Sequence, residues 1–419
     1  MASTSQTSKP AADGGDPDSG LPAVPDLALA QATFVLSQAH LHSIHGEALR
    51  TLTEGIKLHA MGPYLSQLLG ESSESSSSST TPAPISLPAY ASQLRQAVSL
   101  EEVQKANKEE REKLQAKVDE ALVPGAELEV VDALKAKALY LAQIGNKTEA
   151  NEAYEAAYAK TAGIGSKIDM RLAMIRLGFF HSDHKIIKAN IDKAKALVDE
   201  GGDWDRRNRL KAYEGTHLLM LRDFKTGGQL LIDTLSTFGA VELMSLDDFV
   251  RLCIIVGVLT LDRKDLKKKI IDAPEVIQVL PESPHLRYLA SSLHDCDYAQ
   301  FFQSLADVEQ HHLKTSRILY LHTRYYVREL RLKAYAQLLE SYRSVTLQNL
   351  SKAFNLSEDF LDADLARYIA AGRLRASIDK VNGVVETTRS DTKNAHYEAA
   401  LKQGDSLLNG LQKLSRVLG

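Results

Sequence analysis

The placement of proline limits the possible folds of this chain more than any other sequence feature. Two stretches, Gly125–Ala273 and His285–Gly419, contain no proline, and together they make up most of the 419 residues. Proline breaks helix interiors because it lacks an amide donor and clashes with the preceding turn. Both stretches are rich in Ala, Leu, Lys and Glu, which favour helices. The sequence therefore predicts a mostly α-helical protein built from many stacked helices.

The overall composition argues against two broad classes of protein. The net charge is −4 and the pI is about 6.4, whereas a protein whose main partner is nucleic acid carries an excess of lysine and arginine. No apolar run reaches the roughly 18 residues of a membrane span, so we expect no transmembrane helix. Two cysteines, Cys253 and Cys296, are too few for a disulfide framework. A location in the cytoplasm and nucleus fits this composition.

Two segments are predicted to be disordered because they cannot bury enough apolar surface to offset the entropy of ordering. The first is an N-terminal arm at residues 1–25, which is rich in Ser, Pro, Gly and Asp and lacks a signal-peptide pattern. The second is a Ser- and Thr-rich tract at 71–84, interpreted as a tolerated surface insertion or as a carrier of phosphates. The rest of 26–122 is predicted to form N-terminal helices, including a long charged helix at Glu101–Glu120.

A helical-repeat domain is predicted at residues 123–238. Gly145 lies at a turn between two helical patterns, and small and aromatic residues follow it at the spacing of the second helix of a tetratricopeptide repeat. These residues are Ala150, Tyr154 and Ala157. A weaker copy begins at Asp223, about 77 residues later, which corresponds to two periods of a drifting repeat. Such units bury their apolar faces by stacking into a solenoid.

The segment GGDWDRRNRL at 201–210 lies between these copies. Its glycines can end one helix, and Asp203 or Asp205 can cap the next. The only tryptophan, Trp204, is well placed to pack against the new helix. The three arginines that follow admit two interpretations, an anion site or a capped turn with exposed or intersubunit arginines.

The C-terminal third follows the pattern of a winged helix at about residues 326–388. The pattern contains an amphipathic helix, two short capped helices and a β-hairpin, at Tyr326–Tyr342, Thr346–Phe354, Glu358–Ala371, Leu374–Ile378 and Val384–Thr387. Winged helices often bind DNA. Here nine Lys and Arg balance eight Asp and Glu from 326 to 387, and the candidate recognition helix carries four carboxylates that would repel phosphates. A salt bridge is the default expectation for Arg373 and Arg375.

A final helix is predicted within residues 393–419, at about Asn394–Val417. Its apolar residues form a broad stripe at helical spacing: Tyr397, Ala400, Leu401, Leu407, Leu408, Leu411, Leu414 and Leu418. A lone helix of this length is marginal in water, and an exposed leucine stripe is adhesive. The stripe is therefore expected to be buried, against its own chain or in a bundle with helices from other subunits.

Five segments resemble the PCI-containing lid subunits of the 26S proteasome regulatory particle, in the non-ATPase regulatory subunit 6 family. They are GGDWDRRNRLKAYEG at 201–215, FFQSLADVEQ at 301–310, YYVRELRLKAYAQLLESYRS at 325–344, RYIAAGRLRASIDKVNGVVET at 367–387 and LQKLSRV at 411–417. The similarity is strong over about 132–417 and weaker over 25–122. The Ser-rich tract and the long N-terminal arm depart from the family pattern.

The resemblance implies a tetratricopeptide-like solenoid, then a PCI domain at 239–388 that ends in the winged helix, then a C-terminal assembly helix. It implies a non-catalytic scaffold of the lid, whose partners are other PCI subunits, possibly with the proteasome ATPase ring, for ATP-dependent degradation of ubiquitinated proteins. Partner contacts are expected at the winged-helix edge, because edge strands offer unpaired backbone groups, and on the last helix. The residues are Leu374, Arg375, Ala376, Ser377, Ile378, Val384, Val385, Tyr397, Leu401, Leu408, Leu411, Leu414 and Leu418.

Alternative functions remain at this point. A PCI subunit of the COP9 signalosome, namely subunit one, shares the architecture, and a nucleic-acid-binding translation-factor subunit shares the winged helix. A deubiquitinase is disfavoured because the H-x-H at His40 and His42 lacks the downstream ligands that zinc needs. No phosphate-binding loop or nucleophile motif occurs in the sequence. We therefore expect no catalytic residue, cofactor, metal, membrane or small-molecule substrate.

Overall fold

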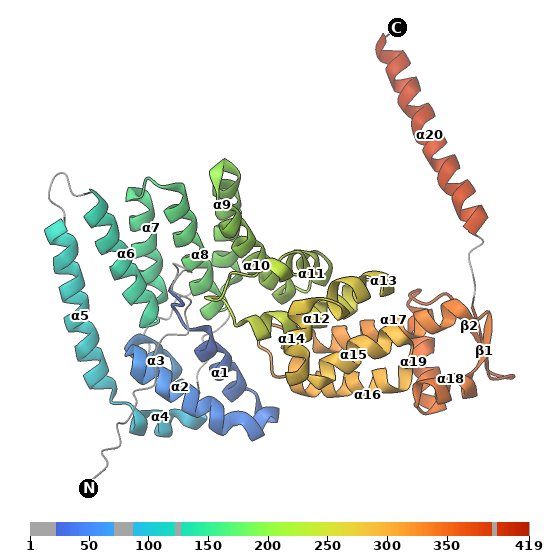
Figure 1. Cartoon of the computed structure of the whole chain (residues 1–419), viewed down its shortest axis with the longest axis horizontal. Coiled ribbons are helices and arrows are strands. Elements are labelled where there is room, and N and C mark those ends of the chain that lie inside the picture. The colour runs from blue at the N-terminus through green and yellow to red at the C-terminus, as the bar shows by residue number, and fades with distance from the viewer. Residues whose placement is uncertain (1–21, 71–86, 122–126, 388–391, 419) are drawn as a thin grey trace. The chain divides into compact units, whose positions relative to one another are not determined.

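A computed structural model describes residues 22–70, 87–121, 127–387 and 392–418. Two segments predicted to be disordered lie outside the described residues. They are the Ser-rich tract at 71–84 and, of the arm predicted at 1–25, residues 1–21. Within the described part the chain is mostly α-helical, as predicted, with one small sheet near the C-terminus (Figure 1). Contacts divide the chain into two units: Met1–Ala290 with Asp307–Arg324, and Ser291–Ala306 with Tyr325–Gly419.

The first unit consists of helices and their connections. Its helices are α1 (Leu27–Ser37), α2 (His45–His59), α3 (Gly62–Leu68), α4 (Ala91–Ala97), α5 (Leu100–Ala121), α6 (Glu127–Gln143), α7 (Lys147–Lys160), α8 (Ile164–Phe180), α9 (His184–Gly201), α10 (Trp204–Met220), α11 (Phe224–Asp233), α12 (Leu246–Thr260), α13 (Arg263–Leu266) and α14 (Pro274–Val279). Short 3₁₀ or π turns lie at Ala39–Ile44, Pro88–Tyr90, Leu235–Thr237, Lys267–Ile271, Leu280–Glu282, Glu309–Leu313 and Tyr320–His322. Helices α15 (Pro284–Asp295) and α16 (Tyr298–Val308) contribute residues to both units.

Three helical hairpins form the repeat region, α6–α7, α8–α9 and α10–α11 (Figure 1). Each hairpin turns at a residue with positive φ, which is Gly145, Ser182 or Arg222. An Asn or Asp shortly after it caps the second helix through its side chain: Asn146, Asp183 and Asp223. The structure confirms the predicted repeat and adds the middle copy. The sequence pattern missed that copy because Ile187 stands where the other copies have the small residues Ala150 and Gly227.

The repeat core is built from small and large apolar residues in alternation. Ala150 and Ala157 are fully buried, and Tyr154 lies between them in the same core cluster. Small residues let the paired helices approach, and the aromatic ring fills the groove that remains. Asp183 strengthens one turn further, since its carboxylate also accepts from Lys147 Nζ at 2.6 Å.

The N-terminal helices pack on the same unit. Their apolar residues form a cluster that includes Phe180 at the end of α8. Arg317 is half-buried and donates to the carbonyl oxygens of Phe179 and Phe180 at 2.7 and 3.2 Å. The long charged helix α5 is present as predicted and buries Leu114 and Val118 on its sparse apolar side.

The second unit holds the winged helix. Its elements are α17 (Thr323–Ser341), β1 (Ser344–Thr346), α18 (Leu347–Phe354), α19 (Glu358–Ala370), β2 (Ala376–Asp379), β3 (Val384–Thr387) and α20 (Thr392–Leu418). The strand order is β1-β3-β2, and both pairings are antiparallel. The predicted hairpin is confirmed, although its first strand begins at Ala376. Strand β1 was not predicted, because a run of three residues is too short to give a strand signal.

None of the helices in the described ranges is long and apolar enough to cross a membrane.

Candidate interaction surfaces

The three-stranded sheet leaves β2 on one edge, and the register shows which of its backbone groups face outward. Thr387 N donates to Arg343 O at 2.8 Å, and Leu347 N donates to Gly383 O at 2.8 Å. The odd-numbered residues of β3 therefore bond to β1, and the even-numbered ones face β2. Across the β2–β3 pairing, the even-numbered β3 residues stand opposite Ser377 and Asp379.

The remaining β2 residues consequently point their backbone groups away from the sheet. They are Ala376 and Ile378. Ala376 N donates to Leu374 O at 3.2 Å, so Ile378 supplies the outward amide of the strand. An outward amide and carbonyl are what another strand would pair with.

The predicted strand residues differ in their accessibility. Arg375 and Ser377 are exposed, and Ile378 and Val384 are half-buried. The side chains of Leu374, Ala376 and Val385 are buried. Because β3 is the middle strand, Val384 and Val385 already have strand partners on both sides. The geometry thus narrows the predicted edge contact to the backbone of β2 and its exposed side chains.

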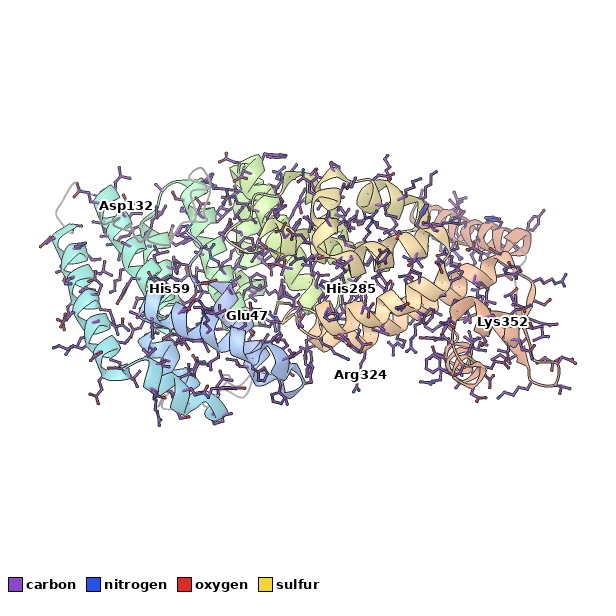
Figure 2. The ribbon with its side chains drawn as sticks, turned by 60° about the horizontal axis from the view of Figure 1, so that its bottom comes forward. Glu47, His59, Asp132, His285, Arg324 and Lys352 are labelled. Carbon is purple, nitrogen blue, oxygen red and sulfur yellow. The ribbon has the colours of Figure 1, made fainter. Side chains whose placement is uncertain are left out.

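The charges of the winged helix are arranged unfavourably for a phosphate backbone. Glu358 and Asp359 are exposed at the start of α19. Arg373 donates to both oxygens of Glu329 at 2.8 and 2.6 Å, the salt bridge expected from the sequence. Lys352 on α18 is exposed (Figure 2). Arg373, beside the wing, is therefore already paired with a carboxylate and is not free to bind a phosphate.

Helix α20 presents its apolar stripe to solvent. Six of its large apolar side chains are 59–70% exposed: Tyr397, Leu401, Leu407, Leu408, Leu411 and Leu414. The helix ends at Leu418, and the structure does not describe the side chain of that residue. A stripe this apolar on a soluble helix is typical of a surface that another helix covers.

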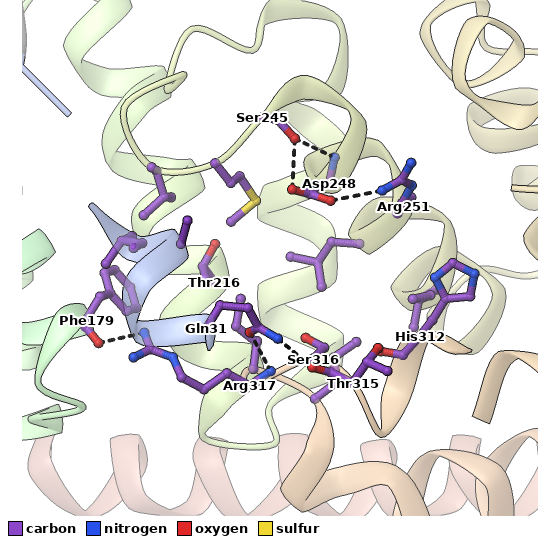
Figure 3. A pocket seen from close by; sticks show the side chains of 18 of the residues that line it. Gln31, Phe179, Thr216, Ser245, Asp248, Arg251, His312, Thr315, Ser316 and Arg317 are labelled. Atoms are coloured by element: carbon purple, nitrogen blue, oxygen red, sulfur yellow. Dashed lines mark hydrogen bonds and ion pairs between the residues drawn. The ribbon is translucent and has the colours of Figure 1, made fainter. Parts of the chain in front are cut away.

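A cavity of about 690 Å³ lies within the first unit, between the start of α1, the start of α12 and residues 311–319 (Figure 3). Ser245 caps α12, since its hydroxyl accepts from Asp248 N at 3.2 Å. Asp248 also pairs with Arg251 at 3.1 Å. Burial lowers the pKa of His312 to about 4, with Arg251 adding to the effect, so its imidazole is neutral at neutral pH. The contacts of Ser245 and Asp248 thus stabilise the first turn of α12 itself.

The reactive side chains that the sequence offers have structural surroundings. Burial raises the pKa of the Cys253 thiol, which makes it a poor nucleophile. His40 stacks on Tyr320, and His45 bonds to Tyr90 Oη at 2.6 Å. Among the described residues, no group of three or more His, Cys, Asp or Glu is arranged to hold a metal ion.

Comparison with known proteins decides the family. The profile of "26S proteasome subunit RPN7" matches residues 97–269, that of the PCI domain matches 297–389, and that of the "RPN7/PSMD6 C-terminal helix" matches 396–418. The chain is 40% identical to the 26S proteasome non-ATPase regulatory subunit 6 homolog of Arabidopsis thaliana, over 94% of this chain and 97% of that protein. The chain belongs to the 26S proteasome non-ATPase regulatory subunit 6 family.

Other relatives agree with this assignment. The Schizosaccharomyces pombe 26S proteasome regulatory subunit rpn7 is 39% identical over 93% of this chain and 95% of its own length. The COP9 signalosome complex subunit 1 of Arabidopsis thaliana is 25% identical over 47% of this chain and 45% of its own length. The signalosome alternative is thus a more distant relationship than membership of the regulatory subunit 6 family.

Proposed function

We propose that this chain is a non-catalytic structural subunit of the proteasome lid, which joins other lid subunits through helix α20 and the β2 edge. The observation that carries the proposal is the exposed stripe of α20, six large apolar side chains that no part of the described chain covers. Burying an exposed leucine stabilises an interface by roughly 1.5–3 kcal/mol, so the stripe can drive association. The match of the C-terminal-helix profile to 396–418 supports a dedicated role for this segment.

The β2 edge is the second proposed contact. Strand pairing through the outward groups of Ile378 would extend the sheet into a neighbouring PCI subunit. The exposed side chains of Arg375 and Ser377 would then set the choice of partner. A soluble scaffold of this kind fits a location in the cytoplasm and nucleus.

The proposal keeps the domain division that the sequence predicts. Helices of 26–122 precede a repeat domain at 123–238, a PCI domain at 239–388 and the assembly helix at 393–419. The repeat domain is the part available for a contact with the ATPase ring. The described reactive groups, a buried thiol and hydrogen-bonded histidines, support a subunit without catalysis of its own.

Mass spectrometry of proteins that co-purify with the tagged full chain tests the assignment. Recovery of proteasome ATPases together with other lid subunits is the expected result. Recovery of signalosome subunits without ATPases would overturn it. Hydrolysis of a ubiquitin reporter by the pure chain would contradict the non-catalytic role.

The edge contact is tested by Ile378→Pro, which removes the outward amide without taking a hydrogen bond from the β2–β3 ladder. Ile378→Val keeps the amide and is the matched control, and Lys352→Ala tests an exposed site on α18. Lid incorporation should fall for the proline variant alone. Normal incorporation of that variant would count against edge pairing, provided that circular dichroism shows the same helix content for all three.

A further inference from the structure

Trp204 is the only tryptophan of the chain, and it is exposed. The sequence predicts that its ring packs against the helix that it begins, but the side chain is 66% exposed at the first position of α10. Burial of the large apolar surface of a tryptophan is favourable, and binding hot spots are enriched in tryptophan. The fold of the free chain therefore does not explain why this indole is exposed.

The surroundings of Trp204 form a small apolar platform at the turn between α9 and α10. Ile164, at the start of α8, is partly exposed. Its Cδ1 atom lies 3.7 Å from where a Cβ on Gly201 would stand, which places it against the same turn. Glycines at 201 and 202 leave no side chains to cover the platform. The indole and the isoleucine are thus both exposed side chains of this turn region.

Ion pairs of the arginines that follow Trp204 hold this turn in place. Arg206 donates through Nε and Nη2 to the two oxygens of Asp169 at 2.8 Å each, a bidentate pair that ties α10 to α8. Arg206 also pairs with Asp203, and Arg209 pairs with Asp205 at 2.8 Å. These pairs argue against the anion site considered from the sequence, because the partly buried arginines already have carboxylate partners. Rigid support lowers the entropy cost of binding at Trp204.

The exposed charge around the indole is negative. Between residues 199 and 207 the exposed charged side chains are four carboxylates and one arginine: Asp199, Glu200, Asp203, Asp205 and Arg207. Arg206 and Arg209 pair with Asp203 and Asp205, so Asp199 and Glu200 supply the excess negative charge. Asp199 and Glu200 stand at the C-terminal end of α9, where the helix dipole disfavours carboxylates by about 0.3–1 kcal/mol each. Negative charge is therefore placed beside the tryptophan at some cost to the stability of the fold.

We infer that this surface, defined by Trp204, Ile164, Asp199 and Glu200, docks a cationic segment of a partner protein. An arginine or lysine of that segment lies over the indole face, the aromatic surface that attracts cations most strongly. Further cations of the segment meet Asp199 and Glu200, and an apolar side chain covers Ile164. The surface shares no residue with helix α20 or the β2 edge, so the inference stands whether or not those contacts are made.

The sole tryptophan supplies the assay. The full chain is titrated with a short blocked peptide that alternates arginine with leucine, and Trp204 fluorescence is followed. The same peptide with glutamate in place of arginine is the peptide control. A saturable change with the arginine peptide alone is expected, weakening as salt is added. No saturable change, or an equal change with both peptides, would overturn the inference.

Two charge-reversed variants separate local recognition from net charge. D199K/E200K changes the turn, and E109K/E112K makes the same change in net charge on the exposed face of α5. Binding should weaken at least about tenfold, or 1.4 kcal/mol, in the first variant and much less in the second. Equal weakening in both would reduce the effect to overall charge and refute a docking surface. Trp204→Phe, followed by calorimetry, should bind more weakly than the wild type, and unchanged affinity would also refute it.

Discussion

Replacing Leu401, Leu408 and Leu411 together by serine is expected to block incorporation into the lid while leaving the free chain folded. The three side chains are 59–68% exposed, so only about a third of each is covered in the free chain. Full burial of a leucine contributes roughly 1.5–3 kcal/mol, of which about two thirds, or about 1–2 kcal/mol, is still available to a partner. The triple variant should then weaken association by about 3–6 kcal/mol, which is a hundredfold or more.

The stability of the free chain should respond differently. Substitutions at exposed sites usually change the free energy of unfolding by no more than about 0.5 kcal/mol. Leucine-to-serine changes also lower helix propensity, so the matched control replaces three exposed polar residues of α20 that lie mainly off the stripe. This control is K402S/D405S/K413S. Both variants should give the wild-type urea midpoint, and lid incorporation should fail for the leucine variant alone.

Quantitative mass spectrometry of lid subunits recovered with each tagged chain reads the association, and urea unfolding of each purified chain reads the stability. A clear drop in the midpoint of the leucine variant alone would mean that α20 packs against its own chain. Normal recovery of lid subunits with the leucine variant would show that the stripe is not the assembly surface. Failure of both variants would mean that helix formation, and not the leucine stripe, limits assembly.

Three further predictions concern stability. His217 is buried, and burial is the main cause that lowers its pKa to about 4 from about 6.5 in the unfolded chain. Its contribution to the free energy of unfolding is therefore complete above pH 6.5 and is lost as the pH falls toward 4. The free energy of unfolding should drop by about 1–2 kcal/mol from this group between pH 7 and 5, and His217→Gln should flatten that dependence; an unchanged slope would contradict it. Gly228→Ala should destabilise by about 1–2 kcal/mol, because its methyl would lie 2.4 Å from a buried valine of α12, whereas Gly46→Ala has open space and should be neutral or stabilising; equal melting temperatures would refute this packing. Asp183→Ala should cost about 2–3 kcal/mol, since it removes a helix cap and a buried partner of a lysine, and Asp183→Asn about half as much, as measured by urea unfolding; equal losses would show that the cap contributes nothing.

Much of this fold could be predicted from local sequence patterns. The absence of proline from Gly125 to Ala273, the small residues at Ala150 and Ala157, and the turn at Gly145 each act within a few residues along the chain. Helix formation, capping and hairpin turns depend on neighbours three or four positions away, so their signals survive in the sequence. The same is true of the leucine stripe of α20, whose period is a property of one helix.

Tertiary structure alone decided the features that join distant segments. Strand β1 exists because Val345 finds Val385 forty residues later, and that pairing makes β3 the middle strand and leaves Ile378 to face outward. Trp204 is exposed although it begins α10, and the pairing of Arg206 with Asp169 joins α10 to α8, which no local pattern records. Local interactions specify elements, whereas long-range contacts choose which faces of those elements remain open to partners, because burial depends on which distant segments meet.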